Sequence, residues 1–141
     1  MKIIGFAINK VSAERKKVSN SKIEIKNNLS IDNISEEKVD IVNKSTLKFD
    51  FSYAISYEPG LAEIKIAGSV LGTEEPETVK AILKEWKDKK FTSDLKIGIL
   101  NYIMGECLLK ALNLEKELGL PPHIPLPKIK NETKNPANYT G

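Results

Sequence analysis

The sequence predicts an α+β domain: a four-stranded antiparallel sheet, then a short and a long helix packed on one face, then a proline-rich C-terminal segment. Alternating apolar and polar residues fill the first half of the chain, helical periodicity follows as far as Leu118, and prolines crowd residues 121–127. The 141 residues, 40% hydrophobic and 29% charged, suit one domain. We therefore expect a single domain over residues 1–130 and a disordered tail over residues 131–141.

Two runs of alternating residues predict the first two strands. Ile4, Phe6 and Ile8 alternate with small or polar residues and indicate a strand that continues towards Ala13. The next run places its apolar residues on one parity: Ile23, Ile25, Leu29 and Ile31. The Asn27–Asn28 pair interrupts this second strand and fits either a bulge or a turn.

A hairpin gives the clearest local pattern in the chain. From Leu47 to Tyr57 every odd position is apolar or aromatic, which is typical of a long, half-buried strand. Glu58-Pro59-Gly60 follows, with the residue types of a type II turn. Residues 62–70 alternate again, so the fourth strand is expected to pair back with the third.

Two helices are predicted next. Thr73 is expected to cap the first, because three glutamates and a proline follow it and suit the positive end of a helix dipole. Its apolar stripe consists of Val79, Ile82, Leu83 and Trp86. The second helix is predicted from Ser93 to Leu118 and stops at Gly119.

The long helix has two apolar faces. One is the expected core stripe, formed by Leu100, Ile103, Met104, Cys107, Ala111, Leu114 and Leu118. The other is expected to join copies of the chain and comprises Leu95, Gly98, Ile99, Tyr102, Gly105 and Leu109. The two glycines are seven residues apart and leave room for close backbone approach. We therefore predict a homo-oligomer, either a dimer or a dimer of dimers.

The sequence offers little for catalysis. The only histidine, His123, lies between a proline and an isoleucine and is interpreted as an ordinary loop residue. No pattern of His, Cys and carboxylates has the spacing of a metal site, and no glycine-rich loop fits a phosphate. The single cysteine, Cys107, is interpreted as a small buried hydrophobe, with a reactive thiol as the alternative. We expect no enzyme activity, metal or cofactor.

Charge and hydropathy limit the compartments and the binding partners that the sequence allows. The net charge is +3, yet only Arg15 among the 22 basic residues is an arginine. The guanidinium group of arginine recognises guanine edges and phosphates, so its scarcity argues against a nucleic-acid-binding function. No secretory signal is recognised, and Lys96, Glu106 and Lys110 interrupt the one long apolar segment. A cytoplasmic protein without a membrane span is therefore expected.

The order of these parts resembles the SecB family of export chaperones and their toxin-antitoxin relatives. The resemblance covers about residues 2–130, and its most specific part is Gly119-Leu-Pro-Pro-His-Ile-Pro-Leu-Pro127 at the end of the long helix. It implies an ATP-independent holdase, a homo-oligomer that binds unfolded or extended polypeptide in hydrophobic grooves.

Six residues are proposed from the sequence to line such a peptide-binding groove: Tyr57, Ile82, Trp86, Phe91, Ile124 and Leu126. Aromatic residues at the edge of a sheet often anchor interfaces, whereas plain packing between the short helix and the sheet is the alternative. Two other functions stay open. One is a small oligomeric adaptor that binds one specific protein partner, and the weaker one is a basic nucleic-acid-binding module.

Overall fold

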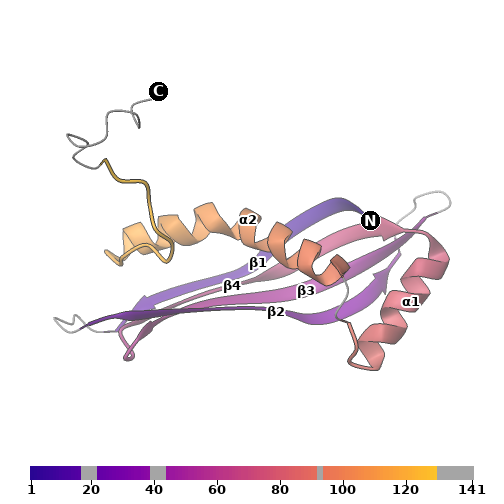
Figure 1. Cartoon of the computed structure of the whole chain (residues 1–141), viewed down its shortest axis with the longest axis horizontal. Helices are drawn as coiled ribbons and strands as arrows, with labels where there is room; N and C mark the ends of the chain where they lie inside the picture. The colour runs from indigo at the N-terminus through magenta and orange to yellow at the C-terminus, as the bar shows by residue number, and fades with distance from the viewer. Residues whose placement is uncertain (17–21, 39–43, 92–93, 130–141) are drawn as a thin grey trace, which may run out of the picture.

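The structure is a computed structural model that describes residues 1–16, 22–38, 44–91 and 94–129. Four antiparallel strands form one sheet in the order β1-β4-β3-β2. The elements are β1 (Lys2–Arg15), β2 (Glu24–Glu37), β3 (Ser45–Glu58), β4 (Ala62–Glu74), α1 (Pro76–Lys87) and α2 (Asp94–Glu117). α2 runs along one face of the sheet, while α1 lies at one end of it and contacts β2 and β3 (Figure 1). The predicted α+β fold is confirmed, and the predicted tail lies outside the described residues.

The hydrophobic core lies between α2 and the two central strands. Along β3 every odd residue from Leu47 to Tyr57 is buried, and β4 pairs with it so that Ile66 stands opposite Tyr53 on the same face. Phe6 from the edge strand β1 stacks on Phe51, with ring centroids 5.6 Å apart. The alternation in the sequence therefore predicts the buried face of the central hairpin correctly.

β2 is continuous through Asn27 and Asn28, so the expected bulge or turn at that pair is wrong. Both residues keep regular register with β3, and the Tyr53 hydroxyl donates a hydrogen bond to Oδ1 of Asn27 at 3.1 Å. The irregularity lies between Ile31 and Asn33 instead. A bulge there shifts the parity, which brings Ile34 onto the buried face.

The turn between β3 and β4 is not type II. The Glu58–Pro59 peptide is cis, whereas cis proline belongs to a different turn class. Gly60 has a φ of 63°, as expected for a glycine at this place, and the Leu61 N–H donates to the Tyr57 carbonyl at 2.8 Å.

The prediction that Thr73 caps α1 is also wrong. Thr73 pairs with both neighbouring strands as part of β4, and its hydroxyl donates to the Lys2 carbonyl at 3.4 Å. The helix begins at Pro76 instead, with Glu75 at the N-cap position and no side-chain capping bond from the described residues. Strand pairing with two neighbours outweighs a single cap bond.

α2 contacts the sheet along a stripe that winds around the helix. Its buried residues are spaced by four: Ile99, Ile103, Cys107, Ala111 and Glu115. Each four-residue step turns about 40° beyond one full turn. Met104 lies off this winding line and is 45% exposed, so its placement in the core was wrong, whereas Cys107 is buried as predicted.

α2 keeps much of its apolar surface outside the core. The most apolar 18-residue stretch of this 24-residue helix has a mean hydropathy of 1.2, so by length and composition alone α2 could cross a membrane. Only 22% of its most apolar stretch is buried. The core helix of a sheet protein can pass the same test, and here one stripe of α2 does cover the sheet. The remaining apolar surface needs another explanation.

Candidate functional site

A cavity of about 530 Å³ opens where α1 gives way to α2, and we call it the Trp86 pocket. Trp86, Lys87, Lys89, Phe91 and Lys96 line it. Phe91 is 4% exposed and contacts Phe49 of the core at 6.4 Å between ring centroids. Trp86 is half-buried and meets Phe91 edge to face at 6.5 Å. The pocket thus joins an aromatic floor, fixed by the core, to an open rim of lysines.

The chain reaches this pocket through a tight turn at the end of α1. The Lys89 N–H donates to the Trp86 carbonyl at 3.1 Å, and the Lys90 N–H donates to the Glu85 carbonyl at 2.8 Å. These two bonds form a Schellman motif, whose left-handed position is usually glycine. Lys89 occupies it with a φ of 57°. The motif reverses the chain and brings Phe91 back beneath Trp86.

A second hollow, the Leu126 groove, lies between the end of α2 and the proline-rich segment and has a volume of about 280 Å³. Leu112, Asn113, Glu115, Lys116, Leu120, Pro122 and Leu126 line it. Gly119 has a φ of 65°, and the Leu120 N–H donates to the Glu115 carbonyl at 2.8 Å. The predicted end of the helix at Gly119 is therefore confirmed.

A buried polar contact fastens the proline-rich segment to α2. Nδ1 of His123 lies 2.8 Å from both carboxylate oxygens of Glu115, and the His123 N–H donates to Oε1 at 3.0 Å. Both side chains are almost completely buried, at 3% and 1% exposure. The interpretation of His123 as an ordinary loop residue is therefore wrong. The sequence signal that was missed is Glu115, a charged residue one four-residue step beyond Ala111 on the buried stripe.

Two further hydrogen bonds hold the same segment. The Tyr57 hydroxyl donates to the Pro121 carbonyl, and Nη1 of Arg15 donates to the Gly119 carbonyl at 3.1 Å. Burial, with Glu115 close by, raises the pKa of Tyr57 well above its ordinary value, so the phenol keeps the proton that it donates. The segment is thus anchored to β1, β3 and α2.

The six residues predicted to bind peptide do not form one groove. Trp86 and Phe91 meet in the Trp86 pocket, and Leu126, 46% exposed, lines the Leu126 groove. Ile124 is half-buried and lines neither place. The first place includes Lys96 at the start of α2 and the second includes Lys116 near its end, so they lie towards opposite ends of the helix that Figure 1 shows along the sheet. Tyr57 and Ile82 are core residues instead, with exposures of 1% and 5%.

The six residues predicted at the contact between chains also separate. Ile99 is a core residue instead, because it is 2% exposed on the buried stripe of α2, while Leu95 and Tyr102 are half-buried. Gly98 and Gly105 are exposed, and Leu109 is 71% exposed. Apart from its sequence neighbours and the nearby helix backbone, a methyl group added at either glycine would meet no described atom within 4 Å. Periodicity missed Ile97, 57% exposed, and Met104. We call the solvent-facing apolar set Ile97, Gly98, Met104, Gly105 and Leu109 the outer face of α2.

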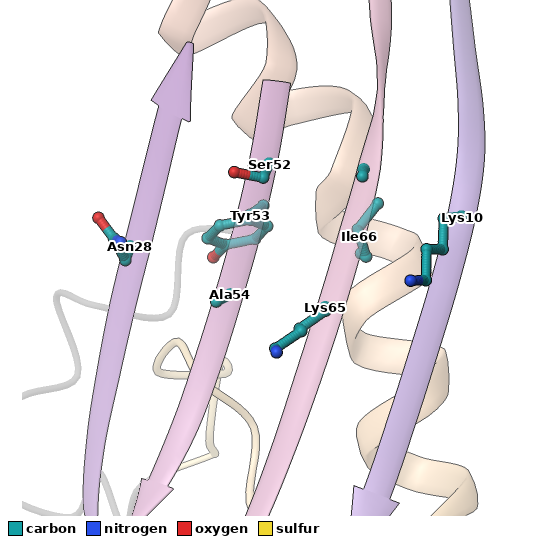
Figure 2. A pocket seen from close by; sticks show the side chains of 8 residues that line it. Lys10, Asn28, Ser52, Tyr53, Ala54, Lys65 and Ile66 are labelled. Atoms are coloured by element: carbon teal, nitrogen blue, oxygen red, sulfur yellow. The ribbon is translucent and has the colours of Figure 1, made fainter. Parts of the chain in front are cut away.

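The face of the sheet away from α2 carries an open hollow of about 310 Å³, lined by both polar and apolar residues. Figure 2 shows Lys10, Asn28 and Lys65 around the small side chains of Ser52 and Ala54, with α2 behind the strands. Nζ of Lys65 pairs with Oε1 of Glu63 at 2.8 Å. Among the described residues, no group of three or more His, Cys, Asp or Glu side chains could hold a metal ion.

Comparison with known proteins identifies the architecture. No protein-family model and no curated protein matches the sequence. Among solved structures, the chain is similar to the SecB-like chaperone Rv1957 of Mycobacterium tuberculosis in complex with a ChAD peptide from the Rv1956 HigA1 antitoxin, with a TM-score of 0.51. The match covers 92% of this chain and 91% of that chain at 11% sequence identity. The fold is SecB-like. The resemblance expected from the sequence is thereby confirmed, and at this identity the SecB-like fold is what the two proteins share.

Proposed function

We propose that the protein is an ATP-independent chaperone, a holdase, that binds unfolded or extended polypeptide on apolar surfaces of a homo-oligomer in the cytoplasm. The observation that carries this proposal is the Trp86 pocket, an open cavity with an aromatic floor in a SecB-like fold. Its volume lies in the range of about 300 to 1,000 Å³ that is usual for binding pockets. The Leu126 groove offers a second apolar place for the same extended chain.

The free edges of the sheet support this function. β1 and β2 form the two edges, and each is 14 residues long. An extended client can add its backbone to such an edge while its side chains enter apolar pockets, and neither contact requires a particular sequence. A holdase needs this tolerance.

The outer face of α2 supports assembly into a homo-oligomer. Ile97, Met104 and Leu109 are large apolar side chains exposed on one helix, and Gly98 and Gly105 leave the backbone between them open. Contiguous exposed apolar surface commonly marks a protein interface. A second copy of α2 would cover this surface and remove it from water.

Light scattering by an aggregating model protein, with and without this protein, tests the proposal. Suppression of scattering without ATP is the expected result. Trp86→Ala should weaken client binding by about 1 to 3 kcal/mol, the range for an interface anchor. Trp86→Phe keeps an aromatic ring in the pocket and should lose less.

Two outcomes would count against the pocket as the client site. The first is no suppression by the wild-type chain at any ratio to the model protein. The second is a large loss of thermal stability in Trp86→Ala with client affinity intact, which would make Trp86 a core residue. Phe49→Ala gives the scale for that comparison, because truncating a buried Phe costs about 3 to 5 kcal/mol.

An adaptor for one partner is the second candidate, because the structurally similar M. tuberculosis protein holds a peptide from a single antitoxin. An adaptor would use the same pockets but select one ligand. Competition separates the two functions: unrelated unfolded chains displace a bound client from a holdase and leave an adaptor's ligand in place.

A further inference from the structure

We propose that the Trp86 pocket selects polypeptide segments in which an aromatic or aliphatic side chain lies next to one or more carboxylates. The inference rests on the proposed function and specifies which extended segments this site prefers. The aromatic floor of Trp86 and Phe91 would receive the apolar side chain. The three lysines of the lining would receive the carboxylates.

The positive rim brings three lysines together from separate places in the chain. Lys87 ends α1, Lys89 follows in the turn, and Lys96 lies in the first turn of α2, and all three lysines line one cavity. Within the described residues, no carboxylate forms an ion pair with any of these three lysines. Asp88 and Asp94 are near in sequence, but neither lines the pocket. A client carboxylate would therefore meet unneutralised charge.

The backbone of Lys89 is a second, independent observation. Glycine is the usual residue at the left-handed position of a Schellman motif, because a side chain there is disfavoured. Lys89 holds that position with a φ of 57°, and its side chain lines the pocket. A residue kept in an unfavourable conformation points to a use for its side chain. Here that use is the positive rim.

The arrangement fits a peptide better than a nucleic acid. Binding of a single strand needs a positive groove that follows the backbone and several aromatic faces for successive bases. In this pocket Phe91 is 4% exposed, and the other aromatic residue, Trp86, is half-buried. One aromatic pocket with a positive rim suits one apolar side chain and its acidic neighbours.

Two synthetic peptides without tryptophan test the proposal on the full chain. Both carry the same Phe and Leu residues, flanked by Asp in one and by Asn in the other. Titration followed by Trp86 fluorescence should show that the Asp peptide binds about three- to tenfold more tightly than the Asn peptide at low salt. This factor corresponds to the summed free energies of a few exposed ion pairs. The difference should shrink as salt screens the rim.

Variants separate binding from folding. Lys89→Gly should lower the preference for the Asp peptide while leaving the thermal midpoint unchanged or raised, because glycine suits the left-handed turn. Lys87→Gln should lower the preference too. Lys80→Gln removes an exposed charge from the same helix outside the pocket and should leave it unchanged.

The outcomes distinguish this proposal from the one on which it rests. Equal affinity for the two peptides, with aggregation still suppressed, overturns the charge selection and leaves the holdase standing. Failure to bind either peptide, without suppression of aggregation, overturns both. If a single-stranded oligonucleotide displaces the Asp peptide, the lysine rim binds nucleic acid. If Lys89→Gly changes the oligomer mass and neither peptide binds, the pocket is a contact with a second copy of the chain. Either result overturns the proposal.

Discussion

Glu115 and His123 form a buried polar contact that holds the proline-rich C-terminal segment against α2. The carboxylate lies on the buried stripe of α2, and the imidazole reaches it from beyond the turn at Gly119. Sequence patterns place Glu115 on a helix but give no partner for it, because the direction of the chain after Gly119 is set by tertiary packing. Lone histidines and lone glutamates are therefore hard to interpret before the structure is known.

Removing His123 should destabilise the protein strongly. His123→Leu removes the imidazole and leaves the buried Glu115 carboxylate with only the backbone N–H of residue 123 from this pair, and breaking such a buried pair typically costs about 3 to 5 kcal/mol. Chemical denaturation measures this free energy of unfolding. The double variant with Glu115→Leu should recover much of the loss, because two apolar groups replace the pair. Additive effects of the two substitutions would contradict a direct coupling.

Stability should fall at alkaline pH. Burial, with a smaller effect from Glu106, raises the pKa of the Cys107 thiol from its ordinary 9.0 to about 11, and burial also raises the pKa of Tyr53 and Tyr57. Between about pH 9 and 11 the folded chain therefore keeps protons that the unfolded chain has lost. The free energy of unfolding decreases as pH rises through this window. Denaturation at several pH values should show a shallower decrease for Cys107→Ala, and identical slopes would remove the thiol from the explanation.

At the scale of elements, the hairpin of β3 and β4 depends on Gly60. A Cβ atom added at Gly60 would meet no described atom within 4 Å apart from the two neighbouring residues, so its replacement chiefly tests the backbone conformation. Gly60→Val places a β-branched residue at a φ of 63°, which should cost about 1 to 2 kcal/mol or more. Thermal unfolding measures the loss. An unchanged midpoint would mean that the turn adopts another conformation in solution.

At Gly105 on the outer face of α2, the size of the substituted side chain should decide whether the substitution stabilises the chain or weakens its assembly. Gly105→Ala should stabilise the separate chain by about 0.5 to 1 kcal/mol, because glycine is a poor helix former and the site is open. Gly105→Leu should weaken assembly, because the larger side chain separates two closely packed helices. Sedimentation across a range of concentrations measures both variants. A wild-type chain that stays monomeric at high concentration would end the proposal.

The elements themselves were largely predictable from local patterns, and their junctions were not. Strict alternation in β3 and the glycine stop of α2 follow from short-range chemistry, so both were predicted correctly. Thr73 was misplaced because pairing between distant strands extends β4 beyond the apolar run. Met104 was predicted in the core and is exposed, whereas Ile99 was predicted at the contact between chains and is buried. Both differences arise because the buried stripe of α2 winds around the helix. The sequence did not predict that Trp86 and Phe91 line one pocket, because the Schellman turn that brings them together has Lys89 at the position where a glycine would have indicated the turn.

At the scale of the whole molecule, the proposed function gives three surfaces separate uses. Under this proposal the outer face of α2 would join copies of the chain, the edges of β1 and β2 would offer backbone pairing, and the Trp86 pocket would take client side chains. The pocket and the outer face share only the start of α2, where Lys96 lines the pocket and Ile97 begins the outer face. Of the three, the pocket is the surface whose occupation can be observed directly.

Trp86 is the only tryptophan in the chain, so its fluorescence reports on the pocket alone. Titration with a permanently unfolded polypeptide that lacks tryptophan tests most directly whether clients bind there. We expect a saturable blue shift of the emission, because the client removes the half-buried indole from water, and a folded protein of similar size should produce none. An emission spectrum that stays unchanged at client concentrations where this chain already suppresses aggregation would contradict the assignment of the pocket as the client site.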